Sequence, residues 1–173
     1  EDTPPQPRSV YHRTKYAAEV MLESMATDAL PVRALRMSRC FPEPADLMAL
    51  YRLHRGVDAR DVGTGHALAL THEGEAFERF ILSGASPFLP EDCDTLARDP
   101  RAVLELRAPE LLAQFEHHEW PLPKNIDRVY CSAKAQQKLG WSPRWGWEEV
   151  VAQAERNDLE ALPAGASIAE RSE

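Results

Sequence analysis

A tyrosine and a lysine stand four residues apart near the start of the chain, and together they could move a proton. Tyr11 and Lys15 are the first and last residues of the segment YHRTK. If this segment is helical, the two side chains share one face and their polar heads lie side by side. A phenol has an ordinary pKa near 10, and a cation within about 4–6 Å lowers that pKa by roughly one to three units. The pair therefore predicts a general acid or base, Tyr11, that is activated by Lys15.

The same spacing also has a purely structural interpretation. With the four tyrosines of this chain and its few lysines, the pattern arises by chance in roughly one chain in ten. An exposed tyrosine–lysine pair on a helix surface contributes little to stability and needs no chemical role. The spacing alone leaves both interpretations open.

Metal chemistry has less support in the sequence. His117, His118 and Cys93 are the side chains that could be combined as ligands. Adjacent residues of a helix point about 100° apart, and no CxxC pair or suitably spaced carboxylate completes a site. We therefore predict no metal. Cys40 is interpreted as a small buried apolar residue, and the four tryptophans are interpreted as packing residues of the C-terminal part rather than as stacking platforms for a base or sugar.

Length and composition exclude several classes of protein. The 173 residues suit one compact core, and 28 acidic against 20 scattered basic residues give a formal charge of −8, which is atypical of nucleic-acid binders. No apolar run approaches the ~20 residues that span a bilayer. Three cysteines without a CxxC pair fit a reducing compartment. We therefore expect a soluble, cytoplasmic protein without a nucleic-acid or membrane partner.

Hydrophobic periodicity indicates how the pair is positioned. Ser9 is placed to cap a helix, Asp58 or Asp61 to cap another, and apolar runs between them have the look of buried strands. The expected elements are a helix from about 10 to 26, a strand at 32–37, helices at 45–52 and 62–70, and a strand at 79–84. This alternation predicts an α/β fold with a parallel sheet. Gly63 and Gly65 inside the second long helix predict a close neighbour there.

The second half of the chain has a different pattern. Beyond Pro87, short helical stretches are interrupted by prolines, and a helix that begins after Ser132 is expected to end at Gly140. A last helix is expected around Trp147. We therefore predict a small, mainly helical C-terminal lobe.

Five blocks of sequence, taken in order, resemble a known family. They are Tyr11-xxx-Lys15-xxx-Glu19, ALRMSRCF at 34–41, VDARDV at 57–62 followed by ALAL at 67–70, FILSG at 80–84, and LGWSP at 139–143. In order and spacing they resemble the C-terminal half of the extended short-chain dehydrogenases/reductases, the NAD-dependent epimerase/dehydratase family. The resemblance runs from Pro7 to about Ala154. It implies a partial Rossmann-like sheet.

The resemblance also implies a division of the chain. Residues 1–84 would be the distal part of a dinucleotide-binding domain, with the YxxxK helix. Residues 85–157 would be a helical segment of the substrate lobe. Beyond the resemblance, residues 158–173 are expected to form a flexible tail. Asp61 matches an aspartate that begins a helix in the family, and an N-cap role is sufficient to explain it.

Roles for individual residues follow from the resemblance. Tyr11 would exchange a proton with a sugar hydroxyl while hydride passes to or from the nicotinamide of NAD or NADP, and Lys15 would also bind the nicotinamide ribose. Met37 and Ser38 match the segment that lies beside the nicotinamide ring. Two copies of the chain would pair through the Tyr11–Lys15 helix.

Two arginines could contact the substrate that the resemblance implies. Arg39 and Arg60 would meet an anionic group such as the diphosphate of a nucleotide-sugar, because guanidinium groups suit phosphate. As single arginines, both also fit an ordinary surface role. The spacing does not separate these two interpretations.

Two functional hypotheses follow. The chain contains no GxGxxG, GxxGxxG or GxxxxGK[ST] segment, the glycine-rich loops that hold nucleotide phosphates. We therefore expect a C-terminal fragment of an NAD(P)-dependent nucleotide-sugar epimerase/dehydratase-type oxidoreductase, inactive by itself. The alternative is a catalytically silent remnant or association module that lacks the cofactor-binding half. We also expect an uncovered apolar patch around Val10, Ala17, Ala18 and Met21, or burial of this patch by another chain.

Overall fold

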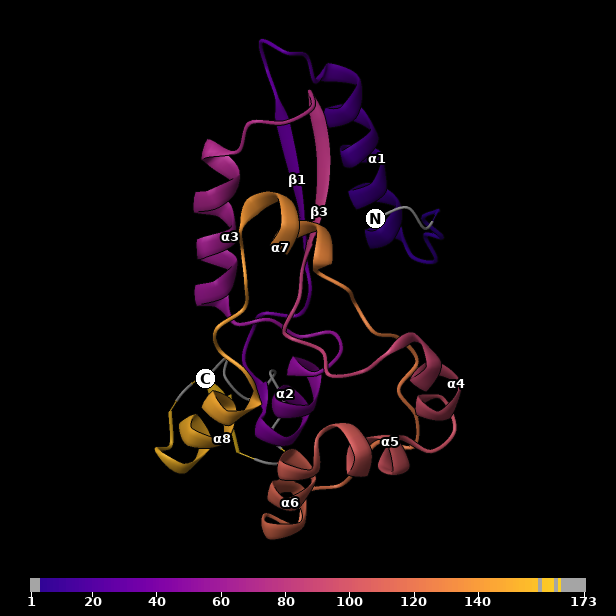
Figure 1. Ribbon diagram of the computed structural model, residues 1–173, viewed down its shortest axis with the longest axis vertical. Helices are drawn as coiled ribbons and strands as arrows, with labels where there is room; N and C mark the ends of the chain where they lie inside the picture. The colour runs from indigo at the N-terminus through magenta and orange to yellow at the C-terminus, as the bar shows by residue number, and fades with distance from the viewer. Residues whose placement is uncertain (1–3, 159, 164, 166–173) are drawn as a thin grey trace.

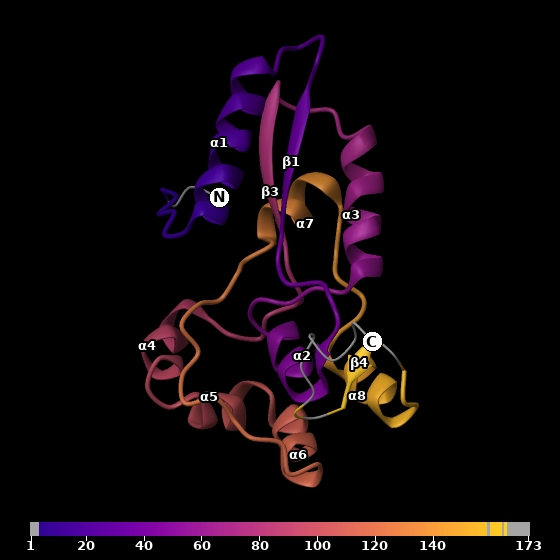
Figure 2. The same cartoon turned by 180° about the vertical axis from the view of Figure 1, so that it is seen from behind.

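The first part of the chain forms a parallel strand pair with a helix on each side. The computed structural model describes residues 4–158, 160–163 and 165. Four elements make up this strand-and-helix layer: α1 (Val10–Met25), β1 (Val32–Met37), α3 (Ala59–Thr71) and β3 (Phe77–Leu82). β1 and β3 are parallel, with Val32 opposite Phe77 and Met37 opposite Leu82. The strands lie between α1 and α3 (Figures 1 and 2). The predicted α/β fold with a Rossmann-like parallel sheet is confirmed.

Local capping explains where the long helices begin. The Ser9 hydroxyl accepts a hydrogen bond from the His12 N–H at 3.2 Å, as predicted for the cap of α1. The Asp58 carboxylate accepts one from the Arg60 N–H at 2.9 Å, so α3 begins at Ala59, earlier than the apolar periodicity indicated. Asp58, and not Asp61, is therefore the N-cap.

Asp61 has a different structural role. Its side chain is buried, and its carboxylate accepts the backbone N–H groups of Arg144 and Trp145 at 3.0 and 3.1 Å. The Asp61 carbonyl accepts the indole N–H of fully buried Trp141 at 2.9 Å. This aspartate therefore fastens the segment before the last helix onto α3, instead of capping α3.

The two glycines of α3 differ in their surroundings. A β-carbon on Gly65 would lie 2.5 Å from a methyl carbon of Leu82, so the predicted close packing is confirmed there. Gly63 has open space around it, and the same prediction is wrong for that residue. Gly140 ends α7 (Ala133–Leu139) in a left-handed conformation with φ of 63°, as expected.

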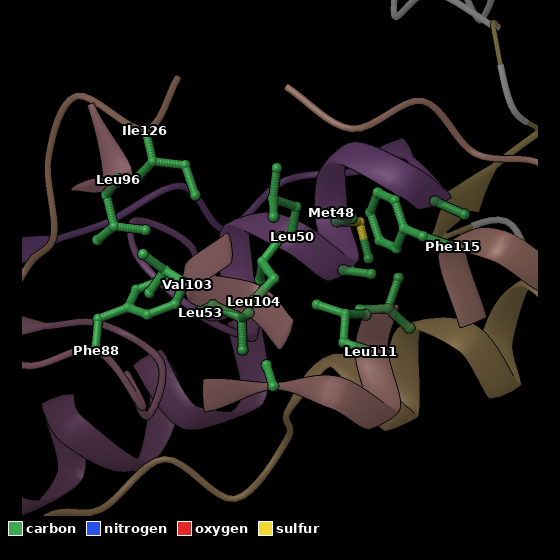
Figure 3. Packing of buried hydrophobic residues seen from close by; sticks show 14 of the residues in the cluster. Met48, Leu50, Leu53, Phe88, Leu96, Val103, Leu104, Leu111, Phe115 and Ile126 are labelled. Atoms are coloured by element: carbon green, nitrogen blue, oxygen red, sulfur yellow. The ribbon is translucent and has the colours of Figure 1, made fainter. Parts of the chain in front are cut away.

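The remaining helices pack around a second core. The further elements are β2 (Glu43–Pro44), α2 (Ala45–Arg52), the 3-10 turn η1 (Pro90–Asp92), α4 (Cys93–Leu96), α5 (Pro100–Arg107), α6 (Pro109–His117), α8 (Trp147–Glu155) and β4 (Ala161–Leu162). Apolar residues from α2, α4, α5 and α6 meet in this core, together with Ile126 from the following segment (Figure 3). A smaller core joins the strand pair to α3 and α7, and it includes Phe80, Leu82 and Trp141. Within the described ranges, no helix has both the length and the apolar character needed to cross a membrane.

Part of the expected tail is ordered. Ala161 and Leu162 fall inside the segment 158–173 that we expected to be flexible, but they are buried and form β4, paired in parallel with β2. The sequence did not indicate this pairing because two residues are too few to show a strand period. Residues 159, 164 and 166–173 of the expected tail lie outside the described residues.

A buried histidine in the turn after α2 contacts the segment that leads to α7. His54 is 4% exposed, and its Nδ1 lies 3.0 Å from the carbonyl oxygen of Arg128. Burial lowers its pKa from 6.5 to about 4, against a smaller opposing effect of the Arg128 hydrogen bond. The imidazole is therefore neutral at pH 7.

We expect acid to destabilise the fold through His54. The unfolded chain binds a proton near pH 6.5 and the folded chain only near pH 4, so this stability is full above pH 6.5 and is lost as the pH falls toward 4. The loss is about 3 kcal/mol. Urea unfolding at pH 7 and pH 4 measures it, with His54→Phe as the comparison. An equal loss in both proteins would contradict this prediction.

Candidate functional site

A cavity of about 400 Å³ lies between α1 and the C-terminal end of β1. One stripe of α1 and the end of β1 form two walls, residues 5–7 before α1 also contribute, and single residues come from β3 and from the segment before α7. The lining residues are Pro5, Gln6, Pro7, His12, Lys15, Tyr16, Glu19, Arg36, Met37, Ser38, Ile81 and Tyr130. The structure therefore brings three of the predicted site residues, Lys15, Met37 and Ser38, to one hollow.

Tyr11 and Lys15 are neighbours on α1, as their spacing predicted. The Lys15 Nζ lies 5.7 Å from the centre of the Tyr11 ring. Tyr11 is 66% exposed and lies beside the cavity rather than among its lining residues. The tyrosine is therefore open to an incoming molecule, and its lysine partner connects it to the cavity.

Glu19 attaches α1 to both strands. Arg36 of β1 donates two hydrogen bonds to the Glu19 carboxylate, at 2.9 and 2.6 Å, and Arg79 of β3 donates one at 2.7 Å. The Arg36 guanidinium, helped by Arg79, holds the pKa of Glu19 below its ordinary value, although partial burial opposes the shift. Arg79 also pairs with Glu23. α1 has no buried residue, so these ion pairs have a large part in fixing it on the sheet.

Ser38 brings an unsatisfied polar atom to the cavity. Its backbone N–H donates to the Leu82 carbonyl at 2.9 Å, which continues the strand pairing. The residue is 9% exposed, and its hydroxyl has no hydrogen-bond partner among the described residues. A buried hydroxyl without a partner is costly, so Ser38 fits a ligand that offers a polar group. Met37 beside it is 49% exposed and adds an apolar surface.

Arg39 does not reach this cavity. Its guanidinium pairs with the buried carboxylate of Glu43 through two hydrogen bonds, which raise the pKa of Arg39. It also lies 4.7 Å from the Phe41 ring centre and 5.5 Å from that of Tyr51. The arginine therefore already has both a charge partner and aromatic neighbours.

Arg60 lies at a different place again, at the start of α3. It bonds the Asp58 carboxylate at 2.8 Å and Glu149 at 3.3 Å, and the Asp58 bond is the main cause that raises the pKa of Arg60. Its guanidinium stacks on Trp145 at 3.7 Å. Neither Arg39 nor Arg60 is among the cavity's lining residues.

Sequence reasoning did not assign most of the cavity's lining residues to a site, among them His12, Tyr16, Glu19 and Tyr130. His12, Lys15, Tyr16 and Glu19 recur at the spacing of one helix face, so the facing stripe of α1 could have been read from the sequence. Tyr130 carried no such signal, because tertiary folding alone brings it to α1.

The other sequence candidates have ordinary surroundings. Among the residues that the structure describes, no group of three or more His, Cys, Asp or Glu side chains is placed to hold a metal ion. The His117 and His118 rings touch, and His118 stacks on Trp120 at 4.7 Å. Cys93 is exposed, whereas Cys40 packs partly buried against the smaller core.

Comparison with solved structures identifies proteins of the same fold. RMD from Pseudomonas aeruginosa, complexed with NADPH, has a TM-score of 0.56 and 17% identity; the match covers 92% of this chain and 59% of that protein. WbmG from Bordetella bronchiseptica, in complex with NAD and UDP, has a TM-score of 0.53 and 19% identity, with coverages of 96% and 57%. No protein-family model and no curated protein matches the sequence.

These matches establish the fold. At 17% and 19% identity, similarity of architecture does not by itself transfer an activity. The chain spans about three fifths of the length of each of the two proteins. The fold implied by the resemblance to the extended short-chain dehydrogenases/reductases is confirmed.

We expect loss of the Glu19 carboxylate to loosen α1. Glu19→Gln removes the charge shared by Arg36 and Arg79, and amide hydrogen exchange in α1 should become faster by about tenfold. Arg13→Gln is the matched control, because no ion pair of Arg13 is present in the described part of the chain. Equal exchange rates in wild type and Glu19→Gln would contradict the anchoring role.

Proposed function

We propose that this chain carries the acid–base helix and the substrate lobe of an NAD(P)-dependent oxidoreductase of the epimerase/dehydratase type, which acts on a nucleotide-sugar. The observation that carries the proposal is the Tyr11–Lys15 pair beside the cavity. The fold supports it, as do the NADPH of the RMD complex and the NAD and UDP of the WbmG complex.

The two side chains would divide the proton chemistry. Tyr11 is the general acid or base, since its exposed hydroxyl can approach a substrate hydroxyl or carbonyl. Lys15 places its ammonium beside that phenol, with Nζ 5.7 Å from the centre of the Tyr11 ring. Lys15 lines the cavity and would also bind the ribose next to the nicotinamide.

The cavity fits the nicotinamide end of a dinucleotide. The Ser38 hydroxyl lacks a partner, and Met37 offers an apolar surface beside it, which suits a flat ring with a polar carboxamide. NAD or NADP, when bound, supplies the hydride acceptor or donor. These 173 residues contain no glycine-rich phosphate loop, so we assign residues to the nicotinamide end alone.

The substrate contacts of Arg39 and Arg60 stay predictions. Each arginine has a carboxylate partner, Glu43 or Asp58, and an anionic substrate group would have to share the guanidinium with it. An arginine can serve two anions because its fork presents five N–H donors. Replacing either arginine by lysine should therefore weaken UDP binding if it contacts the diphosphate, and unchanged binding would remove it from the site.

A second candidate function is an association module, and a specific observation favours it. In β1, the N–H groups of Val32 and Ser38 both point to the β3 side. Peptide groups alternate along a parallel strand, so those of Arg33, Leu35 and Met37 point to an edge that no described strand pairs. Such an edge suits another chain.

The apolar face of α1 supports association as well. The predicted patch is confirmed: Val10 and Met21 are 68% and 57% exposed, and Ala17 and Ala18 are exposed with them. Pairing of two copies through α1 is part of this proposal. Sedimentation velocity measures it, and a monomer at all concentrations would contradict it.

Titration calorimetry with NAD and NADP separates the two functions. If the chain is an association module without cofactor chemistry, neither dinucleotide should bind with micromolar affinity. Tight binding of either one would overturn that second function and would also show that a glycine-rich loop is dispensable here.

Tyr11→Phe tests the acid–base assignment. The change removes one hydroxyl, so turnover of a nucleoside diphosphate sugar with NAD or NADP, measured with the chain complemented by a cofactor-binding half, should fall by about 10²–10⁴-fold, while dinucleotide affinity stays the same. Tyr16→Phe is the matched control, since Tyr16 is a second phenol on the same helix and lines the cavity. Undiminished turnover in Tyr11→Phe would end the assignment.

A further inference from the structure

A long segment without helix or strand connects the two parts of the fold. Residues 119–132, which we call the strap, run from the end of α6 to the start of α7 (Figure 1). Ile126 anchors its middle: the side chain is buried in the helical core, and its N–H donates to the Leu96 carbonyl at 2.8 Å. Beyond Ile126, Asp127 and Arg128 are exposed.

His54 holds the strap at two points close together. Its carbonyl accepts the N–H of Tyr130 at 2.8 Å, and its ring Nδ1 lies 3.0 Å from the Arg128 carbonyl oxygen. A carbonyl can only accept, so Nδ1 carries the hydrogen and donates it. The low pKa of the buried ring agrees with this single neutral form. The ring also meets Tyr51 edge-on at 5.6 Å, which fixes its orientation.

The two hydrogen bonds of His54 with the strap matter because one of them is made by Tyr130. Tyr130 lines the cavity between α1 and β1, and it is the one strap residue among the cavity's lining residues. Tyr130 therefore shares this cavity with Lys15 and Tyr16, although α1 and the strap are far apart in sequence. His54 itself does not line the cavity.

We propose that His54 is a positioning residue, which clamps the strap through Arg128 and Tyr130 and thereby holds the Tyr130 side chain on the wall of the cavity. As a statement about ligand binding, this inference rests on the proposed function. As a statement about the strap, it stands on the two hydrogen bonds and can be measured without any ligand.

Two substitutions of His54 isolate the ring hydrogen bond. His54→Asn keeps an N–H donor near the position of Nδ1, whereas His54→Phe keeps the ring and its contact with Tyr51 but has no donor. Trypsin can cut the strap after Lys124 and after Arg128. Cleavage at these two sites should be about tenfold faster in His54→Phe and close to the wild-type rate in His54→Asn. Equal cleavage in wild type and His54→Phe would overturn the clamp.

A control excludes general destabilisation. Leu104→Ala creates a cavity in the helical core but removes neither partner of the His54 hydrogen bonds, and should lower Tm without selective cleavage at Lys124 and Arg128. If Leu104→Ala, compared at equal distance below its Tm, is cut in the strap as fast as His54→Phe, the clamp is also overturned.

Ligand affinity tests the link to Tyr130. With NADPH and UDP as separate probes, His54→Phe should weaken binding of at least one probe by about three- to tenfold, and His54→Asn should restore it. In a Tyr130→Ala background, His54→Phe should have no further effect. Full affinity in His54→Phe, or an undiminished effect in that background, would overturn the positioning role. If wild type binds neither probe, the proposed function fails, and the trypsin comparison alone decides the clamp.

Discussion

The candidate site depends on the ion pairs that Glu19 makes with the strands. α1 buries none of its side chains, so apolar packing does little to place it. Glu19 instead joins α1 to Arg36 of β1 and Arg79 of β3. Because Lys15 lies one turn from Glu19 on the same stripe, this attachment sets the distance between the Tyr11–Lys15 pair and the end of β1. A partly exposed charge network is weaker than a packed core, and the site therefore rests on one of the less rigid contacts of the fold.

Buried polar groups fix other segments of the fold, and one of these segments reaches the cavity. Asp61 ties the segment before α8 to α3 with two backbone hydrogen bonds, and His54 ties the strap to α2. Both residues are almost completely buried, so their hydrogen bonds are made in a medium where an unsatisfied group costs free energy. Neither contacts the cavity, yet Tyr130 reaches it because His54 holds the strap. The helical part of the chain thus contributes to the site without a helix entering it.

The exposed face of α1 and the unpaired edge of β1 are surfaces that another molecule could cover. Tyr11 and the apolar side chains of α1 share one uncovered helix, and the edge of β1 beside it carries peptide groups that no described strand pairs. A helix that supplied only acid–base chemistry would not need exposed methionines such as Met21 and Met25. The proposed acid–base and association roles of α1 are compatible, because a covering surface would also lower the dielectric constant around the Tyr11–Lys15 pair and strengthen their interaction.

The sequence by itself determined what depends on neighbours along the chain. It placed the cap at Ser9, the Tyr11–Lys15 pair on one helix face, the parallel strands and the end of α7 at Gly140, because caps, turns and periodicity act over a few residues. Tertiary structure decided what depends on distant contacts. It placed the Asp61 carboxylate where it accepts hydrogen bonds from the loop before α8, paired Arg39 and Arg60 with carboxylates, and brought Tyr130 to the cavity. The partner of a side chain depends on which segments come together in the folded chain. The residues next to it in the sequence carry no information about those distant segments.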